Sequence, residues 1–210
     1  MPTCTRPDSL PTISKVDCGI DIGQMVAIIF QRQQLAAPFA TEAAAKLLAG
    51  YTTFLAASDR TKMVKSPEFA NFVIPGTEAV YVGENSNESI GGTGRFAGYN
   101  AAKATGEFQS TPFDIIKQLK PFEDESTPGL TDGLTGIIVT LDGSLLFKKF
   151  DATGTGLGGI PLTNFNVADR QLDGFRAIDK NKFGFTLEPG WSLDLVRVKP
   201  SFNPRTLLNA

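Results

Sequence analysis

The clearest pattern of hydrophobic and polar positions lies in the first quarter of the chain. Residues 24–33 (QMVAIIFQRQ) are rich in β-favouring side chains and predict a largely buried strand. Further on, Thr41 is a suitable helix cap and Glu42 complements the helix dipole, so we predict a helix over residues 41–58. Apolar side chains follow this cap at helical spacing, namely Ala44, Leu47, Leu48, Tyr51 and Leu55.

The middle of the chain alternates short strands with turns and one further helix. Residues 62–84 contain three short β-like runs, and residues 95–109 are predicted to be extended. Between them, Asn85–Gly94 is polar and glycine-rich, which predicts a projecting loop. Thr111, Pro112 and Asp114 indicate a second helix near 112–120 that Pro121 ends, and the acidic segment Glu123–Gly129 is expected to be a flexible, solvated connector.

The last third of the chain has only strand-like patterns. Two apolar runs, 137–141 and 145–150, flank the Asp142-Gly143 turn and give the strongest hairpin signal in the sequence. Further strands are predicted at 162–167, 183–187 and 193–198. Trp191 follows a Pro-Gly turn, and we expect it to cover the end of the β core rather than to form a stacking platform for a ligand.

These elements together predict an α+β, β-rich fold class, either a β-sandwich or a rolled β-barrel with two short flanking helices. Residues 20–199 form a single β-rich domain in this interpretation. Residues 1–19 and 200–210 are polar and contain proline, so we predict extended terminal arms. Such arms either contact neighbouring subunits or fold back on their own domain, and we expect mainly intersubunit contacts.

Composition narrows the possible functions. Among 210 residues there are 20 Lys+Arg, 22 Asp+Glu and no His, giving a net charge of −2. The lack of histidine excludes His-dependent triads and His metal ligands, and the balanced charge does not favour binding to nucleic acid or to an acidic membrane. The first residues lack a signal-peptide pattern, so we expect cytosolic synthesis. Cys4 and Cys18 then stay reduced or, alternatively, form a disulfide.

Three motifs resemble chemical sites. Gly154–Gly159 matches a dinucleotide-binding glycine pattern, but a strand-like run follows where that motif needs a helix. Asp179, Asn181 and Gly184 occupy three positions of a calcium loop, yet the remaining oxygen ligands are missing. Glu123, Asp124 and Glu125 are more typical of a solvated charge run than of an acid/base pair. We therefore expect no enzyme activity and no catalytic, cofactor-binding or metal-binding residues.

The aromatic composition and two sets of segments point to an assembly protein. There are sixteen Phe but three Tyr and one Trp, a balance more typical of cores and permanent interfaces than of wet ligand-binding surfaces. The first set comprises an N-terminal segment with Cys and Pro, a strand ending in FQR, and FATEAAAKLLAGYTTFLAA. The second comprises IPGTEAVYVGENSNES, the Asp-Gly hairpin and FGFTLEPGWSLDLVRVKP. In this order the segments resemble virion structural proteins of tailed bacteriophages, of the tail-tube or connector-ring type.

This resemblance implies a non-enzymatic subunit that is made in the host cytoplasm and becomes part of the virion. The family assembles into homo-oligomeric rings, commonly hexamers, whose sheets join into an inner barrel. Its partners are further copies and other virion proteins, DNA passes through the lumen without specific binding, and no membrane is involved. The alternative hypothesis is a capsid-decoration protein or a host- or glycan-binding β-sandwich module.

Overall fold

The protein is described by a computed structural model covering residues 23–83, 94–151, 154–172, 174 and 178–207. Within these residues the fold is β-rich, with antiparallel pairing between all neighbouring strands. This confirms the predicted α+β class. The predicted N-terminal arm (1–19), both cysteines and most of the Asn85–Gly94 loop lie outside the described residues.

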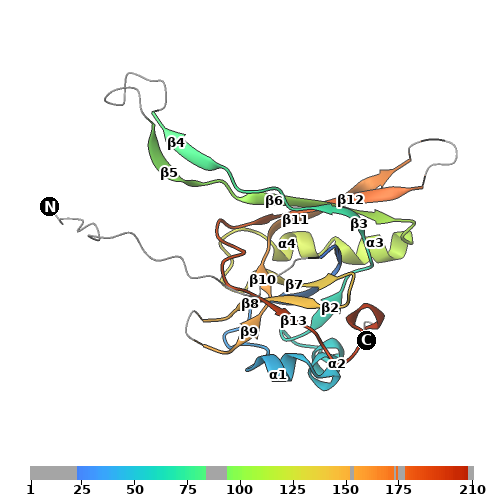
Figure 1. The fold of residues 1–210 in the computed structure, drawn as a ribbon. Coiled ribbons are helices and arrows are strands. Elements are labelled where there is room, and N and C mark those ends of the chain that lie inside the picture. Colours follow the sequence, from blue (N-terminus) through green and yellow to red (C-terminus); the bar gives the residue numbers. More distant parts are fainter. Residues whose placement is uncertain (1–22, 84–93, 152–153, 173, 175–177, 208–210) are drawn as a thin grey trace.

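The largest sheet has seven strands and forms the middle layer in Figure 1. Its main path runs through β13 (Leu195–Val198), β8 (Leu145–Lys149), β7 (Leu134–Thr140), β1 (Met25–Arg32) and β2 (Met63–Lys65). Two short strands extend it, β9 (Leu157–Gly158) beside β8 and β10 (Ile160–Pro161) beside β7. The predicted Asp142-Gly143 hairpin is confirmed, because Ile138 pairs with Leu146 and Val139 pairs with Leu145 across it.

A four-stranded sheet lies above the first in Figure 1 and continues into a separate two-stranded ribbon. The four-stranded sheet has the order β11 (Thr163–Gln171), β12 (Lys180–Leu187), β6 (Ala102–Gln109) and β3 (Ala70–Val73). The ribbon consists of β4 (Ala79–Val82) and β5 (Arg95–Tyr99). In the described part of the chain, the two edge strands of each larger sheet do not pair with each other: β13 and β2 in one sheet, β11 and β3 in the other. Neither sheet closes into a barrel, so the rolled-barrel alternative is wrong.

Two hydrophobic clusters hold these layers together, and β1 contributes to both. Ile28 and Phe30 belong to a cluster with Phe165, Phe183 and other residues of the four-stranded sheet. Ala27 and Ile29, on the opposite face of β1, belong to a second cluster with residues of the α-helical layer. Because side chains of a strand alternate between faces, burial on both faces requires the continuous apolar run that predicted this strand.

The described residues contain four α-helices rather than two. They are α1 (Glu42–Ala45), α2 (Leu48–Ala56), α3 (Phe113–Leu119) and α4 (Phe122–Glu125). The predicted 41–58 helix is interrupted between α1 and α2, although the Thr41 cap is confirmed by a 3.2 Å hydrogen bond from the Ala44 amide. Leu47 lies at this break as the N-cap residue of α2 and is 56% exposed.

The second predicted helix corresponds to α3, but its start and its end differ from the prediction. Pro112 rather than Thr111 is the N-cap residue, and the Thr111 hydroxyl donates to the Gln109 carbonyl instead. After Pro121 the chain forms α4 in place of a flexible connector. Helix α4 is held by Arg32, whose guanidinium forms two hydrogen bonds with Glu125, and by Phe122, which stacks on Phe30 at 5.0 Å.

The C-terminal segment folds back on its own domain as far as it is described. Ser201 donates two hydrogen bonds to the Lys46 carbonyl, and Pro204–Thr206 forms a 3₁₀ helix. Phe202 packs against Tyr51 with a ring-centroid distance of 5.2 Å, and Leu207 is only 7% exposed. The prediction of an extended arm at 200–210 is therefore wrong for residues 200–207. Phe202 and Leu207 show no periodic apolar pattern in the sequence, yet both pack in the cluster that contains α2.

Candidate functional site

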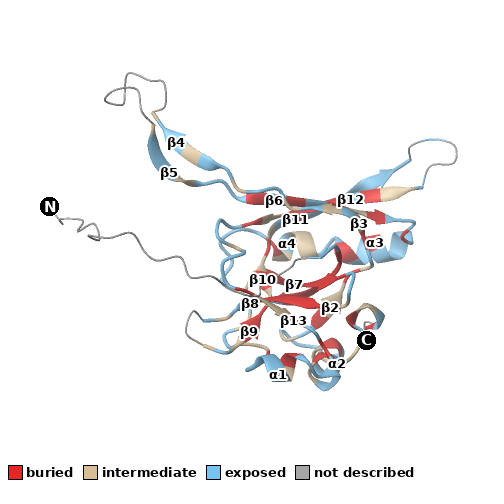
Figure 2. Ribbon diagram, viewed as in Figure 1, coloured by how far each residue is buried: buried red, intermediate tan, exposed pale blue. Residues whose placement is uncertain are grey.

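The β4–β5 ribbon is the most exposed regular element of the described chain. Figure 1 shows it extending away from the body formed by the two larger sheets, and Figure 2 shows that most of its surface is exposed. Ala79 pairs with Tyr99 and Tyr81 pairs with Phe96, and the register shifts at a bulge between these two pairs. An isolated two-stranded ribbon is only marginally stable in water, so such an element usually gains stability from a partner.

Three aromatic side chains gather on this ribbon, and we call them the ribbon cluster: Tyr81, Phe96 and Tyr99. The Tyr81 and Phe96 rings are 5.9 Å apart, and the Phe96 and Tyr99 rings are 5.2 Å apart. Each side chain is nevertheless about half exposed, at 51%, 50% and 56% respectively. An apolar group of this kind on a projecting element is typical of a protein–protein contact.

The ring orientations favour a protein contact over a sugar-binding platform. The Tyr81–Phe96 and Phe96–Tyr99 ring planes are inclined at 66° and 71°. A sugar ring or a base stacks on an aromatic face, and two neighbouring rings can share one flat ligand only if they are close to coplanar. Edge-to-face rings instead present an irregular apolar surface that a complementary protein surface can enclose.

A second candidate surface is the outer face of the four-stranded sheet. Small and polar side chains line an open groove of about 650 Å³ there, including Lys103, Thr105, Glu107, Asn166 and Lys182. Asn71 donates a 2.8 Å hydrogen bond to Glu107, and Lys180 lies 3.6 Å from the same carboxylate. The Asn71 hydrogen bond, together with the nearby lysines, holds the pKa of Glu107 below its usual range. The groove is therefore polar and of mixed charge.

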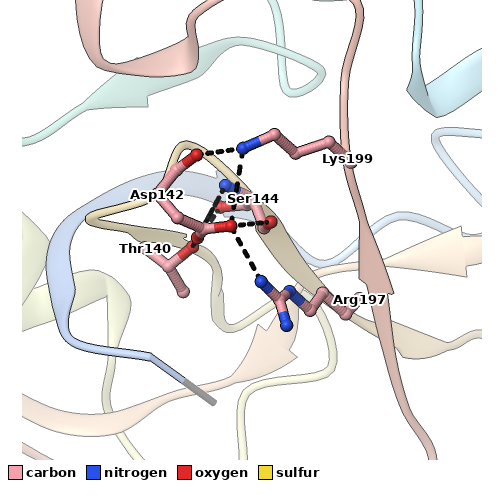
Figure 3. A network of polar contacts seen from close by, with 5 residues as sticks. All are labelled: Thr140, Asp142, Ser144, Arg197 and Lys199. Carbon is pink, nitrogen blue, oxygen red and sulfur yellow. Dashed lines mark hydrogen bonds and ion pairs between the residues drawn. The ribbon is translucent and has the colours of Figure 1, made fainter. Parts of the chain in front are cut away.

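The most connected polar network lies at the β7–β8 turn and is shown in Figure 3. Asp142 accepts hydrogen bonds from the hydroxyls of Thr140 and Ser144 and from Arg197, and Lys199 donates to its backbone carbonyl. These bonds, that from Thr140 above all, hold the pKa of Asp142 well below its usual range. The Ser144 amide donates to the same carboxylate at 3.3 Å, and Arg197 comes from β13, so the network fastens β13 to the hairpin.

The three motifs of the sequence occupy different places in the fold. In Gly154–Gly159, Leu157 and Gly158 form β9, and β10 follows instead of a helix. A side chain at Gly159 would come within 2.6 Å of the Thr135 hydroxyl, so close packing accounts for this glycine. Asp179 forms an ion pair with Arg170, and Asn181 is buried and donates to the Ala168 carbonyl, so the two are engaged within the sheet.

The acidic segment was wrongly predicted to be a flexible connector, since it forms α4 and two of its carboxylates have fixed partners. Glu123 accepts a 2.9 Å hydrogen bond from the Val167 amide, and Glu125 pairs with Arg32. Trp191 is partly buried against the core cluster that joins the two sheets. Within the described ranges, no group of three or more Cys, Asp or Glu side chains is placed to hold a metal ion.

Sequence reasoning did not identify the ribbon cluster. Two of the three tyrosines of the chain, Tyr81 and Tyr99, belong to it, and this is the signal that could have revealed it. The excess of phenylalanine is explained mainly by the core, because Phe96 and Phe113 are the exposed phenylalanines in the described part of the chain. No helix in these residues is both long and apolar enough to span a bilayer.

Comparisons with models of protein families, with curated proteins and with solved structures find no match.

Proposed function

We propose that this chain is a non-enzymatic structural subunit of a tailed-phage virion that assembles with copies of itself into rings or a tube. The ribbon cluster carries the proposal, because Tyr81, Phe96 and Tyr99 remain half exposed on an element that two strands alone stabilise poorly. Assembly covers such side chains and supplies the missing packing. The resemblance of the sequence to tail-tube and connector-ring proteins supports the same proposal.

In this proposal the two larger sheets act as a β-sandwich body and the ribbon makes contacts beyond it. The outer face of the four-stranded sheet is proposed to face the lumen. Lys103 and Lys182 share this face with one carboxylate, Glu107, and with neutral Asn and Thr side chains. DNA binding strengthens with each phosphate that a protein cation neutralises, so a wall of mixed charge suits passage without retention.

A second candidate function is a glycan-binding module, which the same polar groove favours. Its lining of Asn, Thr, Lys and Glu side chains offers hydrogen-bond donors and acceptors suited to sugar hydroxyls. The groove is open and has no exposed aromatic ring among its lining residues, whereas sugar sites usually include one. We therefore rank this function second.

Electron microscopy of the purified full chain tests the proposal. We expect rings, stacked rings or tubes at micromolar concentration. Particles that remain monomers or trimers across the accessible concentration range would contradict a ring-forming subunit. Glycan-array binding by such monomers would favour the second candidate.

A further inference from the structure

A small apolar recess is lined by residues of β1, β2 and α4. It measures about 210 Å³, and its apolar floor includes Phe30, Val64, Pro121, Phe122 and Leu134. Pockets for small ligands usually measure about 300–1,000 Å³, so this recess suits one protein side chain better than a separate ligand. Phe122 is only partly buried and can pack against an incoming aromatic ring, while the buried Phe30 stacks behind it at 5.0 Å.

The rim of the recess is rich in cations. Arg32, Arg60 and Lys62 line it together with the carboxylates of Asp59 and Glu125. Glu125 is already bound by Arg32, and Asp59 is bound by the amide and hydroxyl of Thr61. Arg60 and Lys62 are both exposed. Cations beside an apolar floor favour an aromatic ring over an aliphatic side chain, since the ring face carries negative charge density.

We infer that this recess receives an aromatic side chain of the ribbon cluster from a second copy of the chain. The inference rests on the proposed self-assembly and names the two surfaces that meet. Figure 1 shows the β4–β5 ribbon projecting from the upper left of the body and β2, which carries Val64, in its lower right part, so the ribbon points away from the recess of its own subunit. A contact between different surfaces of identical chains is head-to-tail, and it closes into a ring or continues as a filament.

Site-specific disulfide formation tests this inference. Two single-cysteine chains are prepared with Cys4→Ser and Cys18→Ser, one carrying Ala97→Cys on the ribbon and the other Lys62→Cys on the rim. Ala97 is exposed and lies beside the cluster, so all three rings are kept. Mixing and mild oxidation should give a heterodimeric disulfide at least ten times faster than Leu193→Cys paired with Ala97→Cys. Leu193 is 82% exposed and lies outside both surfaces, which makes it the matched control.

A second measurement uses stability of the assembly. Val64→Arg, which fills the recess, should weaken association at least ten-fold, and Phe96→Ala should do the same. Together they should weaken it no more than either alone, because partners in one contact are not additive. The inference would be overturned if rings form, no disulfide links positions 62 and 97, and the effects of Val64→Arg and Phe96→Ala on association add. The proposed function would then still stand. Chains that never associate would overturn both.

Discussion

Asp142 in the β7–β8 turn accepts a 2.8 Å hydrogen bond from the guanidinium of Arg197, which lies 55 residues further along the chain on β13. This contact connects the strongest local signal of the sequence, the Asp-Gly hairpin, with the terminal strand of the seven-stranded sheet. The same carboxylate also accepts hydrogen bonds from the hydroxyls of Thr140 and Ser144 (Figure 3).

The depressed pKa of Asp142 predicts a dependence of stability on pH. A carboxyl with a lower pKa in the folded state stabilises the fold above its unfolded-state pKa of about 3.9, and this contribution is lost as the pH falls through the folded-state value. Because the side chain is 43% exposed, we expect Asp142→Asn to lower the free energy of unfolding by only about 1 kcal/mol at pH 7.

Urea unfolding of wild type and Asp142→Asn at pH 7, 4 and 2.5 measures this contribution. The difference between the two proteins should shrink below about pH 4. The control is Asp169→Asn, since Asp169 is an exposed aspartate on β11. A difference that stays constant from pH 7 to 2.5 would show that the charge of Asp142 does not stabilise the fold.

Gly106 allows the central strands of the four-stranded sheet to pack against a group of phenylalanines. A Cβ at this position would come within 2.6 Å of the Phe183 ring, which is itself stacked at 4.4 Å on Phe108. We expect Gly106→Ala to destabilise the protein by about 1–3 kcal/mol, the range for overpacking a filled core. Gly76→Ala is the control, because a Cβ there meets nothing within 4 Å. Equal melting temperatures for the two variants would contradict this packing.

Deleting residues 200–210 is predicted to lower the stability of the isolated subunit. The deletion removes the Phe202–Tyr51 contact and the buried Leu207 side chain. Leu207→Ala alone should lower the free energy of unfolding by about 2 kcal/mol, at the low end of the range for buried leucines. Arg205→Ala should change it by less than about 1 kcal/mol, because its pair with Glu68 is at the surface. Thermal unfolding of the monomer measures this effect. If the shortened chain unfolds at the same temperature as the full-length chain, residues 200–207 do not stabilise their own domain.

Local patterns predicted most strands correctly, because strand alternation and turn chemistry are properties of neighbouring residues. β1 and the Asp142-Gly143 hairpin are examples. Contacts far apart in sequence were missed. The acidic segment was predicted to be flexible because Glu123 and Glu125 find their partners at Val167 and Arg32, across 44 and 93 residues.

The candidate site was harder to predict than the fold. Tyr81, Phe96 and Tyr99 have ordinary β-strand patterning, and only pairing across the ribbon brings them together. Trp191 packs against the β core but is only partly buried, because the alternating strand begins at Leu195 and leaves Trp191 in the preceding turn. We therefore expect Trp191→Ala to cost less than the roughly 3–5 kcal/mol typical of a fully buried aromatic.

The central claim is that copies of this chain assemble through the ribbon cluster. Sedimentation velocity of the wild type and of Tyr81→Ser/Phe96→Ser/Tyr99→Ser at equal concentration tests it most directly, with Leu193→Ser as an exposed-apolar control. We predict oligomers for the wild type and the control, and monomers with nearly unchanged unfolding for the triple variant, since exposed substitutions usually alter stability by less than about 0.5 kcal/mol. A monomeric wild type, or a triple variant that assembles as the wild type does, would contradict the claim.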